Sequence, residues 1–349
     1  MKTHSIFALL ALLLALSSCG KKNKSYDETG LSGLTTRTEN LKENITQLPE
    51  KGVLIGQFYG TLEGVEWQND SARSDIHSIC NDWPAVNGYE LAGVESGKKS
   101  NVDGFSFAQI RKNALTYFKQ GGLIVMNWTM PDYQNNDKQL ASYVQKLAEF
   151  INNLQNEYGI KAPVVLNLLP YDHKAWYCQL SAEDYQSLYS DIQNQLNDHD
   201  VNNVVYGYAE NYTSGSDFLS HCPDDISCLQ LNYCQPKAQA NTQLYRQTLE
   251  DMLVKGIPFA QEHQLSLGLM TGMEGITDAA YFEQVLIPCI ESHRLLYLMM
   301  GRNHGNRSGN NFYTPFPGHD NTAISGFMTL FNNEKSIFLS QLNGLYLKR

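Results

Sequence analysis

The sequence lacks the features of several large classes of protein. Lys and Arg total 26 against 36 Asp and Glu, so the formal net charge is −10, and this balance argues against nucleic acid as a partner. The nine histidines are scattered without helical ligand spacing, and no Cys-x-x-Cys pair of the kind found at zinc sites is present. Internal repeats are also absent. We therefore expect no metal or other cofactor, while neutral polymers such as polysaccharides stay possible partners.

The one conspicuous apolar run, Ile6–Leu16, is too short for a membrane-spanning helix. It follows Lys2 and fits the apolar core of a secretion signal. The run ends in Leu16–Cys19, which resembles the bacterial lipobox. That resemblance implies that the Cys19 thiol is lipidated and becomes the new N-terminus. An ordinary signal peptide cleaved nearby and a buried apolar helix are the alternatives.

The predicted anchor places the protein in the cell envelope, on the outer membrane. Lys21, Lys22 and Lys24 follow the cysteine without the acidic run that some bacteria use for surface export, so the side of the membrane is left open. Membrane contact is expected through the anchor only. Residues 1–19 are thus assigned to the signal peptide, 20–50 to a polar tether with a short helix at Glu39–Gln47, and 51–349 to one large domain.

Six further cysteines follow the lipobox: Cys80, Cys178, Cys222, Cys228, Cys234 and Cys289. An oxidising envelope permits disulfides, but the spacing cannot choose among the many pairings. For Cys222, Cys228 and Cys234, partial burial or one local disulfide is favoured over metal binding.

Short apolar runs alternate with amphipathic stretches along the domain. The expected strands are Val53–Phe58, Val86–Leu91, Leu123–Trp128, Val164–Leu169, Val204–Tyr206, Ser227–Leu231, Leu265–Thr271 and Leu295–Met299. Helical periodicity is expected at Asp75–Cys80, Phe107–Phe118, Leu140–Leu154, Ala182–Leu196, Gln243–Lys255 and Ala279–Cys289. This order predicts an α/β protein with the fold of a (β/α)8 TIM barrel. A doubly wound open sheet is the alternative, although no Gly-rich phosphate loop follows the first strand.

Catalytic groups of such barrels lie where strands end. The residues expected there are rich in aromatic rings and amides: Glu90, Glu95, Trp128–Asp132, Tyr171–Trp176, Tyr208–Glu210, Asn232, Tyr233, Met270–Glu274 and Gly301–Asn303. Aromatic faces can stack on pyranose rings while amides and charged groups bond hydroxyls, which indicates a carbohydrate cleft. With 20 tyrosines and 14 phenylalanines, most of the chain's aromatic residues are nevertheless expected in the core.

Four segments resemble glycoside hydrolase family 26, in the family's order. Pro84–Glu95 resembles P-A-V-Y-G-x-D-x-G-G-x-E, and Gly121–Trp128 resembles the strand that ends in S-W-H. Thr271–Ile276 matches T-G-x-E-G-I, and Arg302–His319 resembles R-N followed by Y-x-P-Y-P-G-H. The likeness runs from Gly52 to Tyr346 and implies the barrel of the endo-β-1,4-mannanases.

The resemblance also implies that the hydrolytic pair is missing. The family uses a retaining mechanism in which two carboxyls stand about 5–5.5 Å apart. An ungapped match places Tyr171 on the acid/base glutamate and Met270 on the nucleophile. A thioether cannot act as a carboxylate nucleophile. Asn167 and Pro170 replace an arginine and a histidine, while Gly301 and Thr129 replace a tryptophan and a histidine.

Asp172 and Glu274 are the possible substitutes for the missing pair, since they lie close to the two positions in sequence. Tyr171 as nucleophile and His173 as acid are weaker possibilities, because the first has no partner and the second is expected at the surface.

The sequence predicts a lipid-anchored, noncatalytic binder of β-mannan or a related polysaccharide. Two alternatives are an active hydrolase that uses displaced carboxylates and a scaffold protein that no longer binds sugar. The predicted sugar-binding residues are Trp128, Trp176, Tyr177, Glu90, Asn232, Arg302 and Asn303.

Overall fold

The computed structural model describes residues 29–348, except positions 31, 71, 216 and 310. The predicted signal peptide and Cys19 lie outside the described residues. No helix within the described part of the chain is both long and apolar enough to cross a bilayer.

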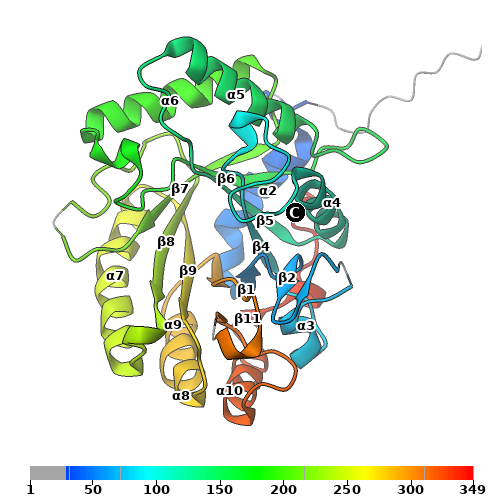
Figure 1. Ribbon diagram of the computed structural model, residues 1–349, viewed down its shortest axis with the longest axis vertical. Helices are drawn as coiled ribbons and strands as arrows, with labels where there is room; N and C mark the ends of the chain where they lie inside the picture. The colour runs from blue at the N-terminus through cyan, green and yellow to red at the C-terminus, as the bar shows by residue number, and fades with distance from the viewer. Residues whose placement is uncertain (1–28, 31, 71, 216, 310, 349) are drawn as a thin grey trace, which may run out of the picture.

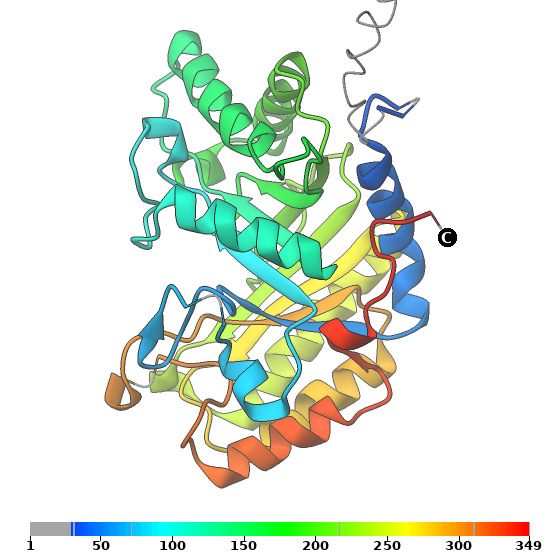
Figure 2. The same cartoon turned by 90° about the vertical axis from the view of Figure 1, so that its right-hand side faces the viewer.

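Eight parallel strands form a closed barrel (Figures 1 and 2). They are β1 (Val53–Phe58), β4 (Val86–Glu90), β5 (Leu123–Trp128), β6 (Val164–Leu168), β7 (Val204–Asn211), β8 (Cys228–Gln235), β9 (Ser266–Met273) and β10 (Tyr297–Met300). Each strand pairs with its neighbours in sequence order, and β10 also pairs with β1, with Leu54 opposite Tyr297. All eight predicted strands and the (β/α)8 fold are confirmed. The open sheet is wrong because this last pairing leaves no edge.

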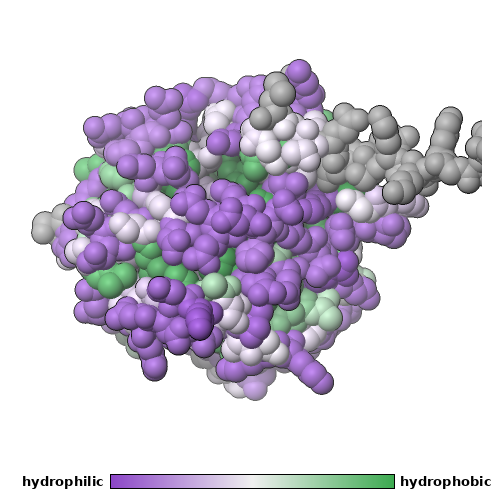
Figure 3. All heavy atoms as spheres, turned by 90° about the horizontal axis from the view of Figure 1, so that it is seen from above, coloured by the Kyte–Doolittle hydropathy of each residue, from purple (hydrophilic) through white to green (hydrophobic). Residues whose placement is uncertain are grey.

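Helices connect the strands on the outside of the barrel. They are α3 (Asp75–Cys80), α4 (Phe107–Gln120), α5 (Asp137–Asn152), α6 (Ala182–Asp198), α7 (Thr242–Glu262), α8 (Ala279–Tyr281), a π-helical turn (Phe282–Leu286), α9 (Ile287–Ser292) and α10 (Asn321–Phe331). Every predicted helix is present, and among the described residues α10 is the one long helix that the prediction omitted. Over α5 and α6 the surface is mainly hydrophilic, with small separate apolar patches (Figure 3).

Local sequence fixes the ends of these helices. Ser106 caps α4 by accepting from the backbone N–H of Gln109, whose side chain accepts from the Ser106 backbone N–H in return. The helix stops at Gly121, which has φ of 90° and takes the left-handed conformation that glycine adopts without strain. The last turn of α4 is thereby directed into β5.

The segment assigned to a tether is in part a component of the barrel. Helix α2 spans Thr36–Gln47 and so begins three residues before the predicted short helix. Leu41 and Ile45 on this helix are fully buried. The Asn44 side chain donates to the backbone carbonyl of Leu345, at 2.8 Å, and so ties α2 to the C-terminal segment. The domain therefore starts well before residue 51, because this helix covers apolar surface of the barrel.

The shorter elements lie at opposite ends of the barrel. The hairpin of β2 (Glu63–Gly64) and β3 (Trp67–Gln68) lies beyond the C-terminal end of β1, on the left in Figure 2. On the other side lie α2, the C-terminal segment and β11 (Ser336–Ile337), which pairs with the start of β1. The 3-10 turns are η1 (Leu48–Glu50), η2 (Val94–Ser96), η3 (Trp176–Gln179), η4 (Lys237–Gln239), η6 (Arg307–Gly309) and η7 (Leu339–Gln341).

The cysteines of the described chain are free thiols. Cys222 and Cys228 are buried and Cys234 is half-buried, in agreement with the expectation of burial. Burial raises the pKa of the Cys178 thiol to about 11, so this group is protonated at neutral pH.

Candidate functional site

An amide network fills the inside of the barrel below the C-terminal strand ends. The Asn167 amide, fully buried on β6, donates to Asn127 at 2.9 Å and to Gln230 at 3.4 Å. Tyr297 donates to the same Gln230 oxygen at 2.7 Å, and the Gln230 amide donates to Asn232 at 2.8 Å. Asn232 is half-buried above this network. Asn232 thus lies at the barrel end as predicted, where its side chain is partly accessible and is oriented by Gln230.

Met270 faces the same interior. Its sulfur lies 3.9 Å from the Gln230 amide nitrogen, and the residue is half-buried. The position that the resemblance gives to the nucleophile therefore borders the polar mouth of the barrel, where it presents a thioether in contact with an amide.

Tyr171 is directed toward the loops outside the barrel. Its ring stacks on His221 with centroids 4.5 Å apart and meets Tyr185 of α6 edge-on at 5.7 Å. The Tyr171 hydroxyl donates to the Cys178 carbonyl at 3.2 Å. Burial raises the Tyr171 pKa to about 12, and the neighbouring Cys178 and Glu210 add to the shift. The ring is 6% exposed, so this phenol is a packed neutral group.

Asp172 and Glu274, the possible substitutes for the catalytic carboxylates, both accept hydrogen bonds from backbone N–H groups of loops. One Asp172 oxygen accepts from the backbone N–H groups of Lys174 and Ala175, each at 2.8 Å. Glu274 accepts from the backbone N–H of Lys237 at 3.0 Å, at the start of η4. Each carboxylate thus satisfies backbone donors of an adjacent turn.

Three of the predicted sugar-binding residues have buried side chains. Trp128 is 0% exposed and its indole N–H donates to Glu95 at 3.1 Å. Tyr177 is likewise fully buried, with its hydroxyl on the Pro170 carbonyl. Asn303 is also 0% exposed and its amide donates to Asp75 at 2.8 Å. These residues hold the loops around the barrel mouth.

Arg302 is already committed to two carboxylates. Its Nε lies 2.6 Å from Glu63 and its Nη1 lies 2.8 Å from Asp103. The guanidinium also lies over the rings of Tyr59 and Phe105, 5.2 and 5.3 Å from their centroids. Arg302 thus joins its own loop to those of Glu63 and Asp103. Its side chain is 22% exposed, so only part of its surface can reach a ligand.

Glu90 ends β4 and is half-buried. Its carboxylate accepts from the backbone N–H of Ala92 at 2.8 Å and from the Thr129 hydroxyl at 3.2 Å. Burial raises the Glu90 pKa to about 7, against the opposing effect of these hydrogen bonds. A carboxyl that titrates near neutrality can either accept or donate a hydrogen bond to a sugar hydroxyl.

Trp176 is the predicted aromatic residue that is accessible. It lines a pocket of about 390 Å³ with Tyr133, between the loop after β5, η3 and α6. The two rings meet edge-on with centroids 5.5 Å apart, and the Trp176 N–H donates to the Met130 carbonyl at 3.0 Å. The polar groups of the pocket are Asn135, Asp184, Ser187 and Asp191. An aromatic wall facing amide, hydroxyl and carboxylate groups suits a sugar ring.

The residues that line this pocket with Trp176 were not predicted from the sequence. Tyr133 lies five residues after β5, in a loop whose path the strand pattern does not set. Asp184 and Asp191 belong to α6, and their spacing of seven residues, two helical turns, is the one signal that could have placed them on a common face. Burial, followed by Asp137 and Asp191, raises the Tyr133 pKa, which keeps its hydroxyl a donor.

Tyr313 occupies the space next to Gly301. A Cβ built on Gly301 would lie 2.6 Å from the Tyr313 ring, and one on Gly272 would lie 2.5 Å from it. The ring is half-buried, and the Tyr313 backbone N–H donates to Asn303 at 2.8 Å. A tyrosine ring thus lies over the position just after β10 where the family resemblance expects tryptophan.

Glu210, which the sequence placed at the barrel rim without a role, is a second carboxyl with a raised pKa. It is fully buried and accepts from the Tyr208 hydroxyl at 2.7 Å and the Leu219 N–H at 3.1 Å. Burial raises its pKa to about 7. Because Tyr208 packs edge-on against Tyr185 of α6, Glu210, two residues along the same strand face, lies outside the barrel and beneath the loop after β7.

No group of three or more His, Cys, Asp or Glu side chains in the described part of the chain is placed to hold a metal ion.

No protein-family model matches the sequence. Among solved structures, a GH26 β-mannanase from Bacteroides ovatus is similar with a TM-score of 0.82 and 25% identity, over 90% of this chain and 98% of that chain. This chain has a GH26-like fold.

The fold also resembles that of two other mannanases. A double mutant of the Cellulomonas fimi endo-β-1,4-mannanase matches with a TM-score of 0.75 and 18% identity, over 90% of this chain and 78% of that one. The catalytic domain of the GH26 endo-β-1,4-mannanase from Bacillus sp. JAMB-750 matches with a TM-score of 0.77 and 19% identity, over 90% and 95% of the two chains.

Proposed function

We propose that this protein is a lipid-anchored, noncatalytic binder of β-mannan or a related polysaccharide. The observation that carries the proposal is the pocket of Trp176 and Tyr133, which combines accessible aromatic surface with amide and carboxylate groups. It lies at the barrel end where mannanases of this fold are expected to hold their substrate. Asn232, Glu90 and Tyr313 would extend the contact surface across the mouth.

The absence of hydrolysis is inferred from two positions. Retaining hydrolysis needs a nucleophilic carboxylate and a second carboxyl that protonates the leaving oxygen. At the first position Met270 offers a thioether beside Gln230. At the second the Tyr171 phenol is packed on His221, and its pKa of about 12 keeps it protonated. Asp172 and Glu274 accept from loop N–H groups, which supports the same interpretation.

The anchor and the location are carried by the sequence motif at Leu16–Cys19. Lipidation at Cys19 would hold the barrel in the cell envelope, on the outer membrane, where captured polysaccharide could be retained for other proteins. Mass spectrometry of the protein extracted from envelopes tests this part, since acylation adds a defined mass to the N-terminal peptide.

Affinity electrophoresis tests the binding. The protein is run through gels that contain β-mannan, galactomannan, mixed-linkage glucan or xylan. We expect retardation in at least the mannan gel, and no retardation in any gel contradicts sugar binding and favours a scaffold role. New reducing ends in the mannan gel would instead indicate an active hydrolase.

A further inference from the structure

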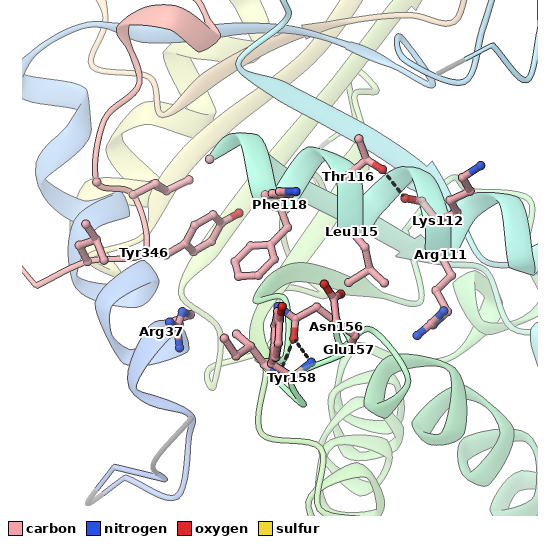
Figure 4. A pocket seen from close by; sticks show the side chains of 16 residues that line it. Arg37, Arg111, Lys112, Leu115, Thr116, Phe118, Asn156, Glu157, Tyr158 and Tyr346 are labelled. Atoms are coloured by element: carbon pink, nitrogen blue, oxygen red, sulfur yellow. Dashed lines mark hydrogen bonds between the residues drawn. The ribbon is translucent and has the colours of Figure 1, made fainter. Parts of the chain in front are cut away.

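A groove lies at the other end of the barrel, beside the starts of β5 and β6. Figure 4 shows Leu115 and Phe118 of α4 facing the loop that carries Tyr158, with Tyr346 of the C-terminal segment and Arg37 of α2 at one side. The volume enclosed is about 700 Å³. We refer to these residues, with Arg111, Lys112, Lys119, Glu157 and Leu347, as the α4 groove.

The α4 groove carries a charge opposite to that of the whole molecule. Four basic residues line it, Arg37, Arg111, Lys112 and Lys119, against one acidic residue, Glu157. The whole chain has a formal net charge of −10. Arg111 donates to the backbone carbonyls of Asn153 and Gln155, neutral partners that fix the guanidinium without cancelling its charge. A local positive field therefore stands out from an acidic surface.

Exposed apolar groups gather at the same place. Tyr158 is 72% exposed and Leu347 is 62% exposed, and both line the α4 groove. They are two of the five large apolar side chains that are exposed in the described residues. Tyrosine and leucine beside lysine and arginine are the residue types that settle at a membrane interface, where the ring or alkyl group enters the headgroup layer and the cations meet phosphates.

The place of the first described residues indicates that a membrane lies near the α4 groove. Thr29 forms an antiparallel bridge with Thr35. Thr35 lies two residues before Arg37, which lines the α4 groove. Cys19 precedes Thr29 by ten residues, which span at most about 35 Å when fully extended. A lipid on Cys19 would therefore keep this end of the barrel within that distance of the bilayer. Trp176, in η3 after β6, lies at the C-terminal strand ends, which are the opposite end of the barrel.

We propose that the α4 groove docks on the anionic headgroups of the membrane that holds the protein. This contact supplements the lipid and fixes the orientation of the barrel, with the sugar-binding end directed away from the bilayer. The inference rests on the proposed lipid anchor and is independent of which polysaccharide is bound. Each Lys or Arg near an anionic surface contributes a modest attraction that adds to that of its neighbours.

Hydrogen–deuterium exchange of the acylated full chain in vesicles tests the docking. Vesicles of phosphatidylethanolamine with phosphatidylglycerol are compared with neutral phosphatidylcholine vesicles. We expect exchange across residues 111–119 and 155–160 to slow about tenfold or more in the anionic vesicles. The double variant Lys112→Glu, Lys119→Glu should lose this protection, and the matched control Lys98→Glu, Lys99→Glu, whose exposed lysines lie in the loop after β4, should keep it.

Equal exchange in both kinds of vesicle would overturn the proposal, and so would protection by β-mannan in place of lipid. An unacylated chain in the mass spectrum would refute the anchor itself. Retardation of the same variants in mannan gels is measured separately. Failure of membrane docking would then show in the vesicle experiment alone, and failure of sugar binding in the gels alone. Thermal melts of both double variants check that the barrel stays folded, as we expect for exposed positions.

Discussion

Trp176 is the residue on which sugar binding depends most directly in this account. Its ring forms the wall of the pocket with Tyr133, and its N–H is already bonded to the Met130 carbonyl. Truncation of a central aromatic contact typically costs about 2 kcal/mol, or roughly thirtyfold in affinity. We therefore expect Trp176→Ala to weaken mannan binding by about that factor, measured by calorimetry or affinity electrophoresis.

Two variants control for indirect effects. Trp176→Phe keeps a smaller aromatic face and lacks the indole N–H, so its affinity should fall much less than that of Trp176→Ala. Tyr158→Ala removes an exposed ring at the opposite end of the barrel and should leave mannan binding unchanged. Equal loss in Trp176→Ala and Tyr158→Ala would place the sugar elsewhere.

Glu210 makes stability depend on pH. Its folded-state pKa of about 7 lies above its ordinary value of 4.5, because burial disfavours the carboxylate. The folded protein thus holds this proton more tightly than the unfolded chain. The resulting stabilisation is complete below pH 4.5 and is lost as the pH rises through 7. Glu210→Gln cannot ionise, so it should lose less stability than the parent between pH 5 and pH 8.

Thermal melts at the two pH values measure this difference. A change on the order of 1 kcal/mol shifts Tm by about 2–4 °C in a protein of this size class. The exposed Glu262→Gln should track the parent at both pH values. Parallel pH profiles for the parent and Glu210→Gln would mean that the buried carboxyl is not protonated in the folded state.

At the scale of elements, the eight strands could be predicted because each is a short apolar run bounded by turn residues. Central strands of a closed parallel barrel are covered on both faces, so Val53–Phe58 is buried along its whole length. Burial of α2 was missed because its mean hydropathy is low and only four of its twelve residues are buried. The contact that incorporates α2, between Asn44 and the C-terminal segment, spans 301 positions and leaves no local signal.

The site was predicted less well than the fold, for a related reason. The alternation of a strand assigns side chains to two faces, but a residue just past the strand end can turn either way. Trp128, the last residue of β5, and Tyr177, in η3, both turn into the protein, where Glu95 and the Pro170 carbonyl accept their hydrogen bonds. Trp176, next to Tyr177, turns outward into the pocket.

Helix α2 offers a test of where the domain begins. Leu41 is fully buried, so Leu41→Ala should cost about 2–5 kcal/mol of unfolding free energy, measured by denaturant titration. The neighbouring Lys42 is exposed, and Lys42→Ala should lie within about 0.5 kcal/mol of the parent. Matching midpoints for both variants would mean that residues 36–47 act as a tether after all.

At the scale of the whole molecule, the barrel separates two surfaces. The C-terminal strand ends carry the pocket of Trp176, and the opposite end carries the α4 groove and the first described residues of the chain. With the proposed lipid on Cys19, the pocket of Trp176 would face away from the membrane. This arrangement follows from barrel geometry, since loops after strands and loops before them emerge at opposite ends.

The central claim is that the barrel binds a mannan chain without cutting it. One incubation of the purified protein with a β-1,4-mannohexaose measures both properties, with the bound fraction read by native mass spectrometry and the chain length of the sugar followed over days. We predict a saturable complex and an unchanged hexasaccharide. Shorter products that accumulate with time would contradict the loss of hydrolysis, and a protein with no bound sugar at any concentration would contradict the binding.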